Sequence, residues 1–218
     1  MPKSPAEPIS RKRWGLLGLL VAGAMIGPML FRQGGEVGLD VRSYPTAQAV
    51  LEDRSAPASE NRLADVTLVA FNDYQCPACL LAYPDMAAAV AKDGKVRIVH
   101  KEWPIFGQRS ERAARVALAS RYQGIYSKVH HALMSGRRAD EQALRDAVKQ
   151  SGGKWRQLEA DLDTHRAEIE EQLARNAQQA FSLGLRGTPA FLIGPFLVRG
   201  RISERDFAKA IRQARDRA

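Results

Sequence analysis

The sequence predicts an α/β domain whose single sheet is built from two separate pieces of the chain, with a helical insertion between them. Apolar, β-branched runs of strand length occur at 66–71 and 96–101, and two more follow near the C-terminus. The long stretch between these pieces, about 108–184, carries apolar residues at helical spacing. A separate apolar run near the N-terminus predicts a signal-anchor or signal helix in front of the domain.

Residues 1–33 are expected to be this signal anchor or signal peptide. Arg11–Arg13 precede Trp14–Phe31, a run of 18 uncharged residues. As a helix the run is about 27 Å long, enough to span a bilayer core. Three interpretations stay open: an uncleaved anchor, a leader removed near Ala22–Ala24, or a buried soluble helix, which the glycines disfavour. Basic residues before the run and acidic residues after it predict that the rest of the chain is exported. In a Gram-negative bacterium that space is the periplasm.

Residues 34–64 are rich in glycine, proline, serine and charge. We expect a linker here, with one short helix at Thr46–Asp53. The folded domain is then predicted at 65–217.

The first half of the domain reads as strand, helix, strand. Val66–Phe71 is the first strand. A helix should begin near Cys76, because Pro77 suits the first helical position, and it should end at Gly94. Val96–Lys101 is the second strand.

The second half begins with the helical insertion, about 108–184, in which several helical patterns end in glycine. Two short strands follow and meet at Gly194-Pro195. A final helix is predicted after Ser203, which can cap it, with Asp206 three residues further on.

The formal net charge of +9 does not indicate nucleic-acid binding. Arginine and lysine are scattered among acidic residues, and no zinc-finger, helix-turn-helix or interleaved aromatic pattern is present. A solvated basic surface is the simpler interpretation, and no nucleic-acid partner is expected.

Both cysteines of the chain, Cys76 and Cys79, stand in one short motif with Pro77 and Ala78 between them. A structural zinc site would need a second ligand pair, and covalent haem attachment would need a histidine where Leu80 stands. A disulfide that closes so short a loop stabilises a fold by only about 2 kcal/mol. Reversible redox chemistry is the interpretation that remains for this pair. Outside the cytosol, where the domain is expected, a cysteine pair can stay oxidised.

The predicted strand–motif–helix order assigns a different role to each sulfur. Cys76 lies at the helix N-terminus, where free N–H groups and the helix dipole favour the thiolate that attacks disulfides. Cys79 lies one turn further on the same face and more buried. It is therefore expected to resolve a mixed disulfide with Cys76.

A second motif, Thr188-Pro189 within "RGTPAFLIG", stands at the entry to a strand. Alone it is an ordinary loop with a proline. In the cis form beside Cys76, it would expose the backbone of Thr188, and an extended substrate would pair with it as an added strand. Pro77, Ala78, Thr188 and Pro189 are the expected substrate-binding residues.

Together, "DYQCPACLLAYP", the helical insertion and "GTPAF" followed by a hairpin and a helix resemble the DsbA-like thiol–disulfide oxidoreductases of the thioredoxin superfamily. The resemblance covers about residues 62–217. It implies a thioredoxin fold, a nucleophilic Cys76, a resolving Cys79, a cis Thr188-Pro189 peptide and a bacterial cell-envelope setting. Pro77-Ala78 departs from the Pro-His pair of the strongly oxidising type protein, so a milder oxidant is expected.

The predicted function is disulfide exchange with exported proteins, reset by a membrane redox partner and without a cofactor. Residues 14–31 would tether the enzyme to the inner membrane. Three alternatives use the same site: a disulfide isomerase or reductase, a protein that holds Cu(I) between the two thiolates, and a binding module without redox chemistry.

Two further pairs of polar residues stand out, Lys101-Glu102 and His130-His131. Lys101-Glu102 ends the second strand, and either residue would assist proton transfer below the active helix, or both form a solvated strand end. His130 and His131 are adjacent on a helix and should point in different directions, which disfavours a metal site.

Overall fold

The computed structural model describes residues 35–136 and 139–217. The strands are β1 (Leu39–Asp40), β2 (Val66–Asn72), β3 (Val96–Glu102), β4 (Ala190–Ile193) and β5 (Phe196–Arg199). The helices are α2 (Pro45–Glu52), α3 (Pro77–Asp93), α4 (Gln108–Ala119), η1 (Ser120–Gln123), α5 (Tyr126–Ser135), α6 (Glu141–Gln150), α7 (Trp155–Thr164), α8 (Arg166–Ser182) and α9 (Glu204–Arg215).

The sheet joins two distant pieces of the chain, as predicted. Its strand order is β1-β5-β4-β2-β3. β2 runs parallel to β3, with Val66 opposite Val96. On its other side β2 pairs antiparallel with β4, where Phe71 lies opposite Ala190. β2 therefore lies between β3 and β4 and holds the two pieces together, and the cysteine motif begins just after its carboxyl end.

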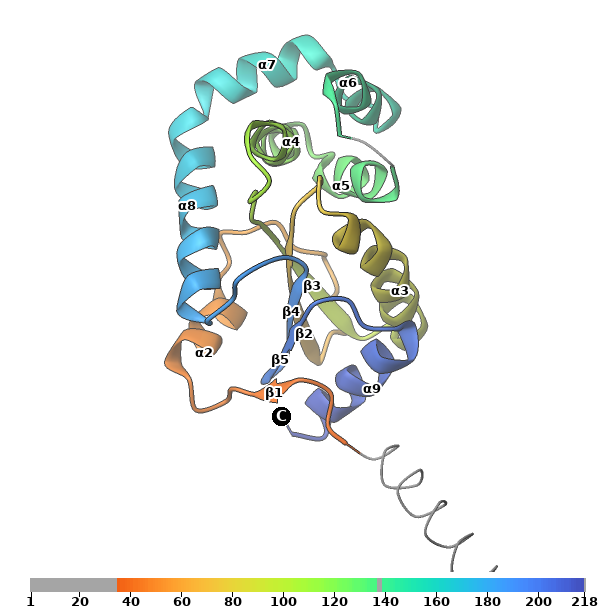
Figure 1. The fold of residues 1–218 in the computed structure, drawn as a ribbon. Helices are drawn as coiled ribbons and strands as arrows, with labels where there is room; N and C mark the ends of the chain where they lie inside the picture. Colours follow the sequence, from red (N-terminus) through yellow and green to blue (C-terminus); the bar gives the residue numbers. More distant parts are fainter. Residues whose placement is uncertain (1–34, 137–138, 218) are drawn as a thin grey trace, which may run out of the picture. The chain divides into compact units, whose positions relative to one another are not determined.

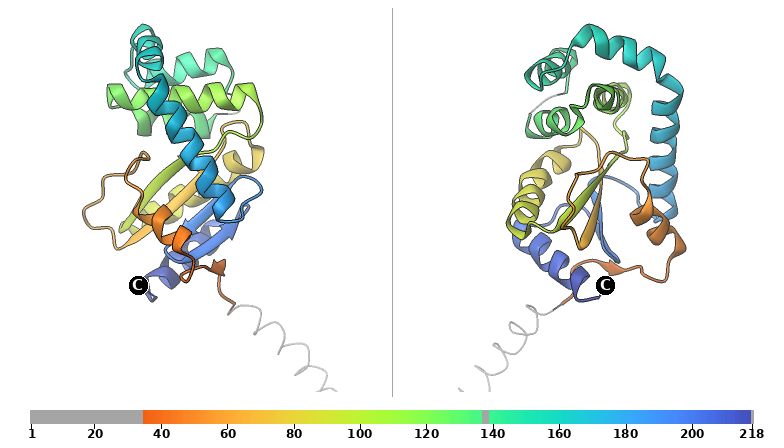
Figure 2. Two further views of the ribbon diagram at one scale, coloured as in Figure 1. Left: turned by 90° about the vertical axis from the view of Figure 1, so that its left-hand side faces the viewer. Right: turned by 180° about the vertical axis from the view of Figure 1, so that it is seen from behind.

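Helices cover both faces of the sheet (Figure 1, Figure 2). α3 and α9 lie on one face, and α2 and α8 lie on the other. Because side chains alternate along a strand, Leu68 and Ala70 pack with Phe207 of α9, whereas Val69 and Phe71 pack in the opposite core. Both faces of β2 are buried, which explains its continuous apolar sequence.

The helical insertion lies at one end of the sheet, with α4, α5, α6 and α7 grouped together (Figure 1). α8 then runs back along the sheet (Figure 2). Helices α4 to α8 occupy residues 108–182, where the sequence predicted them. The insertion has its own core, which includes Val116, Val129 and Leu158, and both cysteines belong to it.

The structure differs from the expected linker at 34–64. β1 pairs with β5, and α2 buries Ala47 and Val50 against the sheet. Ala58 forms a bridge with Val99 of β3, so this segment also covers an edge of the sheet. An uncovered edge strand exposes unpaired backbone groups, and covering it protects the fold. The apolar residues of this segment are sparse and pack against strands that are distant in sequence. The sequence therefore did not indicate that the segment belongs to the folded domain.

Among the residues that the structure describes, no helix combines the length and the apolar character needed to cross a bilayer. The predicted span Trp14–Phe31 lies outside the described residues, and so does the predicted signal anchor at 1–33.

Candidate active site

The two cysteines stand at the start of α3, as the sequence predicted. Cys76 is the N-cap residue and Pro77 is the first helical residue, where its missing N–H leaves no bond unmade. The backbone N–H of Cys79 donates to Cys76 Sγ at 3.3 Å. Both cysteines are buried thiols, whereas Pro77 is exposed beside them. The first sulfur thus receives a hydrogen bond from a free N–H group at the beginning of the helix.

The pKa values of the two thiols are shifted in opposite directions. The hydrogen bond from the Cys79 thiol, with smaller contributions from Thr188 and from the N–H groups of Cys79 and Ala78, outweighs burial and lowers the pKa of Cys76 to about 6. The same bond to Cys76, together with burial, raises the pKa of Cys79 well above its ordinary value. At neutral pH, Cys76 is therefore the thiolate and Cys79 keeps the proton.

Thr188 and Pro189 lie next to Cys76, although 112 positions separate Thr188 from Cys76 in sequence. In the thiol form, Cys76 donates to the Thr188 carbonyl at 3.3 Å. The Thr188-Pro189 peptide bond is cis, in agreement with the expectation from the resemblance. The structure therefore brings together all six predicted site residues: Cys76, Pro77, Ala78, Cys79, Thr188 and Pro189.

Asp73 organises the turn that leads into the motif. Its Oδ1 accepts the Gln75 N–H at 2.7 Å and the Ser110 hydroxyl at 2.7 Å. Its Oδ2 accepts the N–H groups of Ile105 at 2.7 Å and Phe106 at 3.2 Å. Its own carbonyl accepts the Cys76 N–H at 3.1 Å. One buried side chain thus fastens the active-site turn to the loop after β3. The only feature of the sequence that pointed to this role was the position of an aspartate shortly before a helix, where such side chains accept hydrogen bonds from local N–H groups.

Lys101 and Glu102 do not form a solvated strand end; that interpretation was wrong. Lys101 is 0% exposed and Glu102 is 1% exposed. Lys101 Nζ lies 2.5 Å from Asp53 Oδ2. Although burial raises the pKa of Asp53, hydrogen bonds from Lys101, Ser55 and Gln179 together lower it. A buried ammonium needs such a partner, and this one comes from the segment at the end of α2.

Glu102 belongs to a buried polar cluster with Tyr74, Tyr126 and His130. Its Oε1 accepts the hydroxyl of Tyr74 at 2.9 Å and that of Tyr126. Tyr74 Oη lies 2.7 Å from His130 Nδ1. Sequence reasoning missed this cluster, because its members lie on β3, α5 and the turn before α3.

His130 and His131 do point in different directions. His130 faces the buried cluster, whereas His131 Nδ1 lies 2.9 Å from the hydroxyl of Tyr83 at the surface. Within residues 35–136 and 139–217, no group of three or more His, Cys, Asp or Glu side chains is arranged to hold a metal ion.

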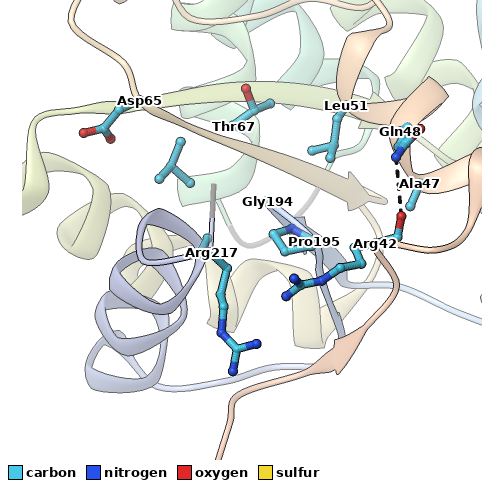
Figure 3. A pocket seen from close by; sticks show the side chains of 11 residues that line it. Arg42, Ala47, Gln48, Leu51, Asp65, Thr67, Gly194, Pro195 and Arg217 are labelled. Atoms are coloured by element: carbon cyan, nitrogen blue, oxygen red, sulfur yellow. Dashed lines mark hydrogen bonds between the residues drawn. The ribbon is translucent and has the colours of Figure 1, made fainter.

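A cavity of about 300 Å³ lies at the other end of the sheet (Figure 3). It is bounded by Thr67 near the start of β2, by Gly194-Pro195 in the turn after β4, and by α2, from which Gln48 donates to the Arg42 carbonyl at 3.4 Å. The cysteines follow the opposite end of β2, so this cavity lies away from them.

Comparison with known proteins gives consistent matches. The model of the DSBA-like thioredoxin domain matches residues 67–212. A thioredoxin-like oxidoreductase from Silicibacter pomeroyi DSS-3 is 36% identical, with a TM-score of 0.73 over 78% of this chain and 98% of that chain. The thiol-disulfide exchange protein alpha-DsbA2 from Wolbachia pipientis is 26% identical, with a TM-score of 0.71 over 79% of this chain and 97% of that one.

A curated relative gives the same result. A probable disulfide bond formation protein D from Bacillus anthracis is 23% identical over 201 residues, which cover 87% of this chain and 86% of that protein. The fold, the paired cysteines at the helix start and the family match agree. The chain belongs to the DSBA-like thioredoxin domain family and is an oxidoreductase of its thiol–disulfide class.

Proposed function

We propose that this enzyme exchanges disulfides with exported proteins in the bacterial cell envelope through Cys76 and Cys79. The observation that carries the proposal is the placement of Cys76 Sγ, which accepts the Cys79 N–H and lies 3.3 Å from the Thr188 carbonyl. A nucleophile with a lowered pKa is thus held beside a backbone on which an extended substrate can lie.

In the oxidising direction two electrons pass from a pair of substrate thiols to the Cys76–Cys79 disulfide, in two exchange steps. A substrate thiolate attacks Cys76 of the oxidised enzyme, the Cys76–Cys79 bond breaks, and Cys79 leaves with the electron pair and takes up a proton. A second substrate thiolate then attacks the substrate sulfur of the mixed disulfide, and Cys76 leaves as the thiolate. The substrate gains one disulfide, and the enzyme becomes a dithiol that a membrane redox partner must oxidise again.

The same steps run backwards in a reductase or isomerase. The lowered pKa of Cys76, about 6, lies between the values typical of the strong oxidant DsbA, about 3.5, and of the reductant thioredoxin, about 7. A more acidic nucleophile stabilises the reduced enzyme and makes its disulfide a stronger oxidant. We therefore expect a milder oxidant than DsbA, which suits either oxidation or isomerisation.

The N-terminal run supports the proposed location. Arg11–Arg13 followed by the uncharged Trp14–Phe31 is the pattern of an exported protein that keeps an inner-membrane anchor or loses a leader. We propose the periplasm as the site of action. The proposed redox domain is 65–217 together with the part of 34–64 that packs on its sheet.

The test is to trap the mixed disulfide with an unfolded protein substrate that carries a disulfide bond. With Cys79→Ser, a substrate that is presented as a disulfide should accumulate as an adduct on Cys76, because the resolving thiol is missing. With Cys76→Ser no adduct should form, because Cys79 is buried and weakly acidic. Adduct formation by Cys76→Ser at the rate of Cys79→Ser would refute the assigned roles.

A further inference from the structure

The three residues before Cys76 are each bonded to a different part of the protein. The side chain of Asp73 accepts hydrogen bonds from the loop after β3. The hydroxyl of Tyr74 belongs to the buried polar cluster, which includes residues of β3 and α5. The side-chain amide of Gln75 donates to the carbonyl of Ala139, between α5 and α6, at 3.0 Å. The position of Cys76 therefore depends on contacts with β3 and with the helical insertion.

Tyr74 connects the cysteine pair to the buried polar cluster. Its side chain is buried in the same apolar core as Cys76 and Cys79. Its hydroxyl lies 2.9 Å from Glu102 Oε1 and 2.7 Å from His130 Nδ1. The disulfide-exchange steps described above use none of the side chains of this cluster.

The hydroxyl protons determine how the cluster is bonded. Burial and the nearby Glu102 raise the pKa of Tyr74 and that of Tyr126, so both hydroxyls stay protonated. Each hydroxyl has one proton and donates it to Glu102 Oε1. His130 Nδ1 must then be the donor to the oxygen of Tyr74. The Tyr74 hydroxyl is thus the middle member of a hydrogen-bonded chain from His130 to Glu102.

A hydroxyl that both donates and accepts holds its ring in one place. Moving the ring of Tyr74 would break a bond to a buried carboxylate, and such charge-assisted bonds are about twice as strong as neutral ones. It would also leave buried polar groups unpaired, which costs more than an ordinary hydrogen bond contributes. The backbone two residues before Cys76 is therefore held in position from inside the protein.

We propose that Tyr74 is a positioning residue, which acts through the turn before α3 and holds Cys76 where its thiolate is most stable. In the structure both cysteines are free thiols, and Cys76 Sγ accepts the Cys79 N–H. A turn that is held less firmly weakens this bond on average. The reduced enzyme then loses stability, so its disulfide becomes a weaker oxidant. The inference rests on the proposed function, since it concerns the redox balance of the same pair.

The test is the equilibrium of Tyr74→Phe with reduced and oxidised glutathione. This variant keeps the buried ring and removes only the hydroxyl. One hydrogen bond of ordinary net strength corresponds to about a fivefold change in an equilibrium constant. We therefore expect the pair to become about fivefold less oxidising, or about 20 mV, and Cys76 to be alkylated more slowly at neutral pH. A wild-type equilibrium in Tyr74→Phe would overturn the inference.

Two other tyrosines control for the loss of a hydroxyl. Tyr122→Phe is the matched control, because Tyr122 donates to Glu168 at 2.7 Å in the helical insertion, outside the cluster. This variant should keep the wild-type equilibrium. Tyr126→Phe removes the other hydroxyl from Glu102 Oε1, but Tyr126 lies on α5. It should lower the free energy of unfolding and change the redox equilibrium less. A change as large as that in Tyr74→Phe would contradict the assignment.

Glu102→Gln separates position from charge. The amide oxygen still accepts both tyrosine hydroxyls, but the negative charge is gone. Because a negative charge nearby disfavours a thiolate, its loss should leave the oxidising strength of the pair unchanged or increase it. A decrease as large as that in Tyr74→Phe would contradict the inference, since this variant keeps the bonds of Tyr74.

The same measurement separates this inference from the proposed function. A wild-type pair that does not exchange with glutathione would refute the proposed function. Reversible exchange in the wild type, together with an unchanged equilibrium in Tyr74→Phe, would refute only the role of Tyr74.

Discussion

Replacing Cys79 by alanine should make Cys76 less acidic. The hydrogen bond from the Cys79 thiol is the largest cause of the lowered pKa of Cys76. Cys79→Ala removes that bond, but it keeps the backbone N–H of residue 79 that bonds to Cys76 Sγ. We therefore expect a pKa between about 6 and the ordinary value of 9.0.

The size of the effect follows from these two values. A thiol with a pKa of about 6 is about 90% ionised at neutral pH, whereas a thiol with a pKa of 9.0 is about 1% ionised. The assay is the pH dependence of alkylation by iodoacetamide, together with the ultraviolet absorbance of the thiolate. In the companion variant Cys76→Ala, no thiol should ionise in this range, because the pKa of Cys79 is raised.

The same shift links acidity to folding. Since the folded pKa of Cys76 is depressed, its ionisation stabilises the reduced protein above the unfolded pKa, and this stabilisation is lost as the pH falls towards about 6. The free energy of unfolding of the reduced protein should therefore rise between about pH 6 and about pH 9, relative to Cys76→Ala. A wild-type Cys76 that titrates near 9.0, or a Cys79→Ala variant that still titrates near 6, would refute the reasoning.

Three further predictions concern the scaffold. Asp73→Ala removes the acceptor of four hydrogen bonds and should lower the free energy of unfolding by about 3 kcal/mol or more in urea titrations, whereas an unchanged midpoint would contradict the role of this side chain. Lys101→Met should cost about 3–5 kcal/mol because it leaves Asp53 without its buried partner, and adding Asp53→Leu should restore most of that loss in the same assay. Ser203→Ala removes the side chain that accepts the Asp206 N–H and should lower the free energy of unfolding by about 1 kcal/mol, seen as a lower midpoint of thermal unfolding.

Much of the fold was predictable because its signals are local. The apolar run Val66–Phe71, Pro77 at the start of α3 and Ser203 before α9 each determine structure within a few residues, and the structure agrees at all three. Gly94 ends α3 with a φ of 75°, a conformation that favours glycine.

The remaining features depend on distant partners. Lys101 is buried because Asp53, 48 residues earlier, approaches it in the folded chain. Val50 of the expected linker is buried because the sheet offers it a surface. In both cases the two contacting parts lie far apart in sequence. Local sequence patterns therefore indicated only polar or irregular segments where the fold makes specific contacts.

The residues of the candidate site divide in the same way. Cys76 and Cys79 were found from their spacing, and Thr188-Pro189 from its resemblance to a known motif. The bonds of Asp73 to the loop after β3 were not found, because the loop carries no motif of its own.

The most direct measurement of the central claim is the equilibrium of the Cys76–Cys79 pair with reduced and oxidised glutathione, read out by mass after alkylation. The predicted result is one reversible two-electron transition, with any glutathione adduct on Cys76. Its potential should lie between about −120 mV, typical of DsbA, and about −270 mV, typical of thioredoxin. A pair that does not close and reopen, or adducts that form on Cys79 instead, would contradict the account.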